Sequence, residues 1–306
     1  MLRVASLVII AVAFAMFTGC ASVRNTADVA KYEELSAGGD QSATRALIVA
    51  LRSHDRAERD EAYKALISSG SPSVPELLKS LNDEDPDIRE YAAAALGDIG
   101  DPRAVTPLLE MLKTEPRRRY VAAWALGKLK AESAIDPLIS ALAEKNDALQ
   151  KESARALIAI GAPAVPALIK ALDSSDNDVR AFSARALGII EDKRAEEPLI
   201  RHINDENTTV AAAAALALGT AGTDASVRPL IAALNAVDMM TRVNATISLG
   251  TLNAKDAVEP LTAIMDKDED PYVREWSARA LENITGNRYK YKDEHGMTVY
   301  PYNLYR

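Results

Sequence analysis

The chain has 306 residues, a hydrophobic fraction of 48% and a net charge of −8. Nucleic-acid binding depends on clustered cations that release counterions, so the excess of acidic residues argues against a nucleic-acid partner. One cysteine and three histidines far apart in sequence exclude a disulfide framework and leave little for a zinc site, so we expect no cofactor, no metal site and no enzymatic activity.

The N-terminal segment predicts export. Arg3 precedes an almost unbroken apolar run over residues 4–16. This run is shorter than the roughly 20 residues of a membrane span and is typical of a secretory signal. The following Phe17-Thr18-Gly19-Cys20 resembles a bacterial lipobox, although Phe17 stands where leucine is usual. The resemblance implies that residues 1–19 are removed and that Cys20 becomes the lipidated N-terminus; the alternatives are an ordinary signal peptide and an uncleaved signal anchor.

The lipobox resemblance also implies a location. Ala21 follows the cysteine, and in lipoproteins a residue other than aspartate there implies transfer to the outer membrane where the organism has one. We therefore expect a lipid-anchored protein of the cell envelope that faces the periplasm. Residues 20–42 are expected to be the lipidated cysteine and a polar tether, with room for one short helix.

From residue 43 to residue 287 one unit recurs about eight times. The dipeptide Leu-Gly, replaced once by Leu-Ile, recurs at steps of 30 or 31 residues. Each unit predicts two helices. The first, the A helix, often has a proline such as Pro107 in its first turn, and the second, the Ala-rich B helix, opens with an acid or amide such as Asp85. A two-helix unit cannot bury its apolar face alone, so the units are expected to stack. The copies of the dipeptide are Leu96-Gly97, Leu126-Gly127, Leu157-Ile158, Leu187-Gly188, Leu218-Gly219 and Leu249-Gly250.

This pattern resembles the HEAT-like repeats of the phycobilisome-lyase type. The resemblance implies an all-α fold, a right-handed α-solenoid (α-α superhelix) of about eight two-helix repeats, with the B helices lining its concave surface. Similar proteins include chromophore lyases and DNA glycosylases. A glycosylase needs a basic groove and a lyase needs polar groups that converge on a cofactor, and the sequence predicts neither.

Two columns of charged residues look catalytic at first sight. An acid or amide opens each B helix, and an arginine often follows four residues later. The columns could bind an anionic ligand, but we favour a structural role in which the acids cap the helices and the arginines bridge to acids of neighbouring units. The first column is Asp55, Asp85, Glu115, Asn146, Asp176, Asn207, Asp238 and Asp270, and the second is Arg59, Arg89, Arg119, Arg180, Arg242 and Arg274.

Positions two, five and nine residues after the arginine column are not dictated by the repeat, and they share one face of the B helix. Both tryptophans occur there, and aromatic and arginine side chains dominate the hot spots of protein interfaces. The alternative is that the rings fill gaps between B helices. The predicted partner-binding face consists of Tyr91, Trp124, Arg155, Phe182, Arg185, Trp276 and Arg279.

Residues 288–306 depart from the repeat and hold half of the ten tyrosines. They predict a short hairpin and a C-terminal cap over the apolar edge of the last repeat, and recognition of a glycan or peptide is the alternative.

The whole pattern favours a membrane-anchored, non-catalytic scaffold that binds a protein partner through the concave face of the solenoid. A structural or assembly factor of a cell-envelope complex and an enzyme of the chromophore-lyase type are the alternatives.

Overall fold

The structure is a computed structural model that describes residues 26–115 and 117–301. The predicted signal peptide over residues 1–19 and the predicted lipidation site at Cys20 lie outside the described residues. The chain divides into two compact units, Met1–Leu129 and Lys130–Arg306, and each is described by itself.

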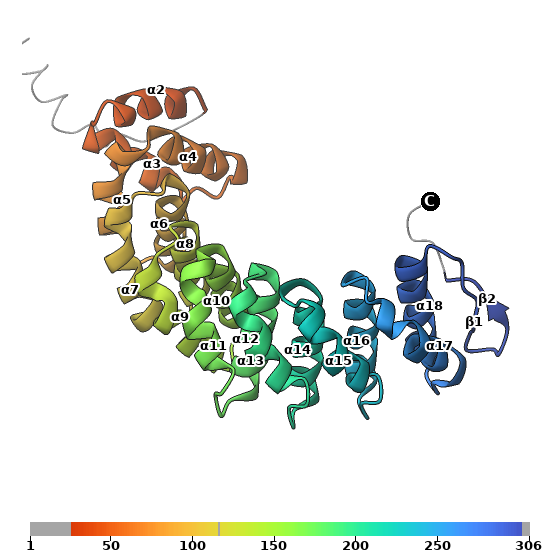
Figure 1. Ribbon diagram of the computed structural model, residues 1–306. Coiled ribbons are helices and arrows are strands. Elements are labelled where there is room, and N and C mark those ends of the chain that lie inside the picture. Colours follow the sequence, from red (N-terminus) through yellow and green to blue (C-terminus); the bar gives the residue numbers. More distant parts are fainter. Residues whose placement is uncertain (1–25, 116, 302–306) are drawn as a thin grey trace, which may run out of the picture. The chain divides into compact units, whose positions relative to one another are not determined.

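Unit 1 is a stack of helices joined by short turns. From α3 onward the helices alternate between A helices (α3, α5, α7) and B helices (α4, α6, α8), and each A helix packs against the B helix that follows it. Figure 1 shows α5 and α7 on one side of this unit and α6 and α8 on the other. The elements are α2 (Thr26–Ala37), α3 (Gln41–Ala50), α4 (Arg56–Ser69), η1 (Ser71–Ser73), α5 (Val74–Ser80), α6 (Pro86–Ile99), η2 (Pro102–Ala104), α7 (Val105–Thr114) and α8 (Arg119–Lys128).

Unit 2 continues the alternation, and its B helices α10, α12, α14, α16 and α18 pack side by side in that order. Within the described residues α3 to α18 form eight helix pairs, so the predicted all-α stack of two-helix repeats is confirmed. The elements are η3 (Glu132–Ala134), α9 (Ile135–Leu142), α10 (Asp147–Ile160), η4 (Ala162–Ala164), α11 (Val165–Ala171), α12 (Asn177–Ile190), η5 (Lys193–Ala195), α13 (Glu196–His202), α14 (Thr208–Ala221), η6 (Asp224–Ser226), α15 (Val227–Ala233), α16 (Met239–Thr251), η7 (Lys255–Ala257), α17 (Val258–Lys267), α18 (Pro271–Thr285), β1 (Tyr291–Lys292) and β2 (Thr298–Val299).

Among the helices that the structure describes, none is by itself both long enough and apolar enough to span a membrane. The segments Asp147–Ile160 and Ala162–Ala171 meet that requirement only when they are taken together, across a bend of 109°.

The first column of charged residues caps the B helices, as predicted, with one exception. Asp85 accepts a hydrogen bond from the backbone N–H of Asp87, and six more members of the column do the same at their own helices. The prediction is wrong for Glu115. Helix α7 has 10 residues where α5 has 7, so Glu115 ends α7 instead of opening α8, and Arg118 takes the cap position.

Residues 26–37 form one short helix, α2, for which the predicted tether left room, but α2 packs against α3 and α4 and is therefore part of the folded stack instead of a tether. Ser36 is fully buried, and its Oγ lies 2.7 Å from Oγ1 of Thr44 and 3.2 Å from Oγ of Ser73. Val29 is also buried. Burial of a hydroxyl is costly unless it is hydrogen-bonded, so these contacts favour the packing of α2 on the first repeat. Helix α2 therefore covers the apolar edge that a first repeat would otherwise expose.

The predicted C-terminal hairpin is present. Strands β1 and β2 pair antiparallel, with Tyr291 opposite Val299. The first strand contacts α17 and α18. Arg274 of α18 donates through Nε to the carbonyl oxygen of Lys292 at 2.7 Å and through Nη2 to that of Asp293 at 3.2 Å. The hairpin is thus tied to the last repeat by a guanidinium group.

Removal of residues 288–306 is expected to lower the unfolding free energy by about 1 kcal/mol, since Arg274 loses two acceptors that contribute roughly 0.5–1.5 kcal/mol each while water replaces part of their effect. Thermal unfolding followed by circular dichroism measures this. Tyr300→Ala is the control, because it keeps the hairpin backbone and should change stability less. An unchanged melting temperature after truncation would mean that the segment does not cap the stack.

Candidate functional site

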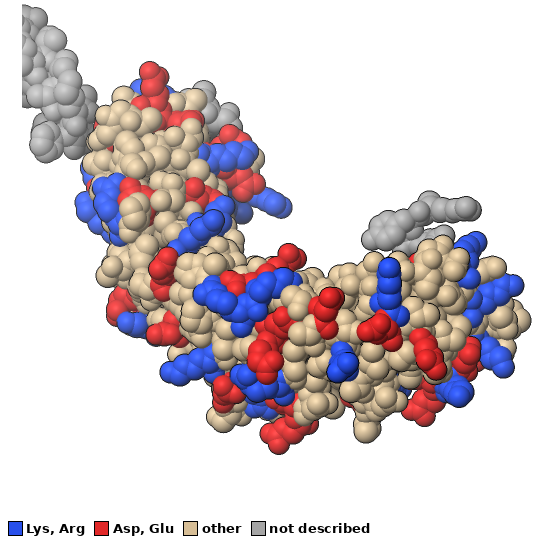
Figure 2. Space-filling model, in the orientation of Figure 1, with Lys and Arg blue, Asp and Glu red and all other residues tan. Residues whose placement is uncertain are grey.

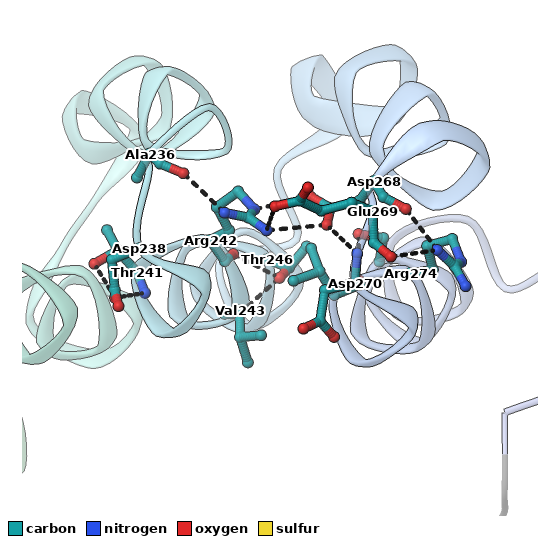
Figure 3. A network of polar contacts seen from close by, with 12 residues as sticks. Ala236, Asp238, Thr241, Arg242, Val243, Thr246, Asp268, Glu269, Asp270 and Arg274 are labelled. Atoms are coloured by element: carbon teal, nitrogen blue, oxygen red, sulfur yellow. Dashed lines mark hydrogen bonds and ion pairs between the residues drawn. The ribbon is translucent and has the colours of Figure 1, made fainter. Parts of the chain in front are cut away.

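The arginine column is a ladder between repeats. In three repeats the guanidinium donates through Nε and Nη2 to a carboxylate of the next repeat, and its Nη1 donates to the backbone carbonyl oxygen six residues earlier. Figure 3 shows Arg242 between Asp268 and the carbonyl oxygen of Ala236. The predicted structural role is confirmed for these three pairs, Arg89 with Glu115, Arg180 with Asp205 and Arg242 with Asp268.

The ladder changes the pKa values of its carboxyl groups. Burial raises the pKa of Asp205, but hydrogen bonds from Arg180 and from the backbone N–H of Asn207 outweigh burial and hold the pKa below its usual value. At Glu115 the hydrogen bond from Arg89 is the largest cause, and it lowers the pKa. These carboxylates are therefore ionised at neutral pH and are engaged in holding neighbouring repeats together.

Two of the three histidines lie in different elements of unit 2. His202 lies on α13, where its Nδ1 is 2.9 Å from the carbonyl oxygen of Pro198, and His295 lies in the turn of the C-terminal hairpin. In the described part of the chain, no group of three or more His, Cys, Asp and Glu residues is arranged to hold a metal ion.

Two residues of the predicted face, Tyr91 and Trp124, belong to a cluster on the B helices of unit 1. The Tyr63 hydroxyl donates to Oδ2 of Asp98 at 2.9 Å, and Nζ of Lys128 lies 3.1 Å from Oδ1 of the same carboxylate. Lys128 also lies 5.5 Å from the centre of the Trp124 ring, and the Tyr63 and Tyr91 rings are 6.0 Å apart. Burial, together with the bond to Asp98, raises the pKa of Tyr63, so its hydroxyl stays protonated and acts as the donor.

The rings of unit 1 also have a packing role. A Cβ atom at Gly97 of α6 would lie 3.0 Å from Cζ3 of Trp124, so this ring occupies the space above the glycine. Tyr91 and Trp124 are both half-buried. The rings therefore pack between B helices, and only their exposed parts can meet a partner.

The other five residues of the predicted face lie on unit 2, in two separate places. Arg155 is on α10 and Phe182 and Arg185 are on α12, whereas Trp276 and Arg279 are on α18. In each place a cation faces a ring of its own helix: Cζ of Arg185 is 5.8 Å from the Phe182 ring centre, and Cζ of Arg279 is 5.3 Å from that of Trp276. Helices α14 and α16 lie between the two groups.

Those intervening helices carry an apolar surface that the sequence prediction missed. Helices α12, α14 and α16 line a hollow of about 540 Å³. A second hollow of about 340 Å³ adjoins it and shares Arg185, Ala213 and Leu216. Ile189 is 61% exposed and Leu216 is 45% exposed. We call the two hollows together the α12–α16 groove, which is shaped by Arg185, Ile189, Ala213, Leu216, Met240 and Ile247.

A signal for the groove was present in the sequence. Ala213, Leu216 and Ile247 occupy the positions two and five residues after the arginine column, and Ile189 occupies the ninth. These residues are aliphatic, whereas the predicted partner-binding face consists of aromatic and arginine residues. Charge does not mark a binding surface on the face drawn in Figure 2, because basic and acidic side chains are interspersed there within each unit.

Comparison with known proteins agrees with the architecture. Residues 44–126, 113–178, 165–238 and 227–291 each match the family described as HEAT repeats. HEAT repeats generally mediate protein binding. No curated protein matches the chain.

Two of the solved structures that resemble this chain, importin beta and Kap95p, show the same fold. Importin beta has a TM-score of 0.59 and 15% identity over 87% of this chain and 45% of its own. Kap95p, in its complex with RanGDP, has a TM-score of 0.59 and 13% identity over 85% of this chain and 43% of its own. The CpcE–CpcF complex of phycocyanin lyase from Nostoc sp. PCC7120 has a TM-score of 0.46 and 25% identity over 48% of this chain and 98% of that one. This chain therefore spans less than half the length of importin beta.

Proposed function

We propose that this chain, which belongs to the HEAT-repeat family, is a non-catalytic scaffold that is anchored to a membrane of the cell envelope and binds a protein partner on its B-helix surface. The observation that carries the proposal is the α12–α16 groove. It is recessed and apolar, and it exposes Ile189 and Leu216 to solvent. Contiguous exposed apolar surface of this kind commonly marks a binding site.

The residues beside the groove support the same proposal. Phe182 and Arg185 on α12 form one cation–ring pair, and Trp276 and Arg279 on α18 form another. Aromatic and arginine side chains are enriched at protein-interface hot spots, which cluster around apolar centres. The polar columns of the repeat, by contrast, are engaged in helix caps and in the arginine ladder.

The anchor is proposed from the lipobox resemblance at Cys20. Helix α2 begins at Thr26, so residues 21–25 are all that separates it from the lipidated cysteine. This stretch reaches about 20 Å at full extension, so unit 1 would be held close to the membrane surface. In an organism with an outer membrane, Ala21 favours that membrane and a periplasmic orientation.

Metabolic labelling with palmitate tests the anchor. The wild-type chain is expected to take up label and to sediment with membranes, and Cys20→Ser is expected to lose label, processing and membrane association. A processed wild-type chain that stays soluble would contradict the proposal.

Site-specific photo-crosslinking in cells tests the binding surface. A benzophenone amino acid is placed at Ile189, within the groove, or at Val49, which is 55% exposed on α3 of unit 1 and serves as the matched control. We expect a discrete crosslinked protein from position 189 that is lost when Leu216→Glu is added. Equal crosslinking from both positions, or none from position 189, would refute binding at this surface.

A further inference from the structure

The α12–α16 groove stays open because its floor consists of small residues. Ala213 and Ala217 of α14 are buried, and Gly188 of α12 lies against Ala217 so closely that a Cβ atom there would be 2.7 Å from its Cα. The neighbouring helices therefore approach each other through their backbones. Larger apolar side chains of the groove, among them Ile189 and Leu216, are exposed to solvent.

Arg185 is a cation at the junction of the two hollows. Its Cζ lies over the ring of Phe182, and among the described residues no carboxylate lies within ion-pair distance of its guanidinium. Asp178 of the same helix interacts with it electrostatically from farther away, but the Asp178 carboxylate is paired with Lys145. The corresponding arginines of α10 and α18 differ in this respect, because Arg155 pairs with Glu152 and Arg279 pairs with Glu275. Arg185 is thus an exposed guanidinium beside apolar surface, and it is available to donate paired hydrogen bonds to a partner's carboxylate.

The acidic residues of the groove fix where such a carboxylate would lie. Glu191 is exposed at the end of α12 and lines the larger hollow. It lies six positions after Arg185, which corresponds to about 9 Å along a helix. Asp238 lines the smaller hollow, but it already accepts hydrogen bonds from the backbone and the hydroxyl group of Thr241. Charge complementarity therefore favours an acid at the Arg185 junction and disfavours one near Glu191.

We propose that the α12–α16 groove binds an amphipathic protein segment whose apolar side chains fill the two hollows and whose aspartate or glutamate pairs with Arg185. The inference rests on the proposed function and assigns the chemistry of the partner. A recessed floor beside Arg185, the one lining cation that forms no ion pair among the described residues, suits side chains that enter it. A membrane surface would need protruding apolar groups and several cations.

Selection of peptides tests this chemistry. A phage library of random peptides is panned against the full chain, and a consensus peptide is synthesised in an acidic form and in a form with lysine in place of the acid. We expect the selected peptides to combine apolar residues with an acid. Arg185→Glu should weaken the acidic form at least tenfold and strengthen the lysine form, and Leu216→Glu should abolish binding of both. The control Arg201→Glu makes the same charge change on α13, which is an A helix and does not line the groove, and it should leave both affinities unchanged.

Three outcomes would overturn the inference: no enrichment of peptides, enrichment without acids, or acidic peptides that are insensitive to Arg185→Glu. Binding of the chain to vesicles of anionic lipid that is lost with Leu216→Glu, without peptide binding, would also overturn it in favour of a membrane surface. Photo-crosslinking from position 189 separates the two proposals. Crosslinking that persists in Arg185→Glu leaves the scaffold function intact and removes only the acidic partner.

Discussion

Arg180→Met is expected to destabilise unit 2 by about 3–5 kcal/mol, because it leaves the carboxylate of Asp205 buried without a counter-charge. The two side chains are each 8% exposed, and the guanidinium donates to both carboxylate oxygens at 2.9 and 3.0 Å. The same side chain also satisfies the carbonyl oxygen of Ser174, which would lose its partner. Urea unfolding followed by circular dichroism, with hydrogen exchange read at α12 and α14, measures the effect.

Two variants show whether the buried charge is the cause. Arg59→Met removes the equivalent arginine of the first repeat, which is half-buried and donates to the carbonyl oxygen of Ser53. It should cost about 1 kcal/mol, the usual contribution of a single hydrogen bond. Adding Asp205→Asn to Arg180→Met removes the stranded charge but keeps an acceptor for the backbone N–H of Asn207. The double variant should be more stable than Arg180→Met alone, and an equal or lower stability would contradict the mechanism.

The pH dependence of stability should separate these variants as well. The folded-state pKa of Asp205 lies below its usual value, so the pair stabilises the wild-type chain above the unfolded-state pKa of about 4. That contribution is lost as pH falls through the lower folded-state value. In Arg180→Met, burial without the cation raises the pKa of Asp205 instead, so protonation of Asp205 removes the cost of its buried, unpaired charge. The difference between wild type and Arg180→Met is therefore expected to shrink as pH falls below about 5.

The repeat architecture could be predicted from sequence because it is encoded locally. Asp85 and Asp270 cap helices within two residues of themselves, and the Leu-Gly dipeptide marks each B helix. Glu115 could not be assigned in this way. Its role depends on the length of α7, and only the structure shows that it accepts from Arg89 of the preceding repeat rather than capping α8.

The contacts that local patterns miss are those between elements. The sequence of α2 is polar enough to suggest a tether, and its placement depends on Ser36 meeting Thr44 and Ser73 in the core. The α12–α16 groove likewise depends on neighbouring helices, because the small Ala213 lines a hollow only together with the larger side chains of Leu216 and of Ile189 on α12. The aliphatic residues could be read from the repeat positions, but the hollow forms only because α12, α14 and α16 lie side by side.

Gly188→Ala is expected to destabilise the stack by about 2 kcal/mol, although alanine is the better helix former by about 1 kcal/mol. The added Cβ atom would lie 2.7 Å from both Cα and Cβ of Ala217, and neither atom belongs to a flexible side-chain end. Helices α12 and α14 must therefore move apart. Thermal unfolding of the variant should show a lower melting temperature than wild type.

Gly250→Ala is the matched control, since Gly250 ends the same dipeptide two repeats later. There the added Cβ atom would lie 3.1 Å from Cα and Cβ of Ala280, a distance that a small shift relieves, so stability should change by less than about 1 kcal/mol. Gly188 also forms the floor of the α12–α16 groove, whereas Gly250 does not line it. Gly188→Ala should thus weaken binding of the acidic consensus peptide while Gly250→Ala preserves it. Equal losses of stability in the two variants would show that the close approach of α12 and α14 at Gly188 is not the cause of the destabilisation.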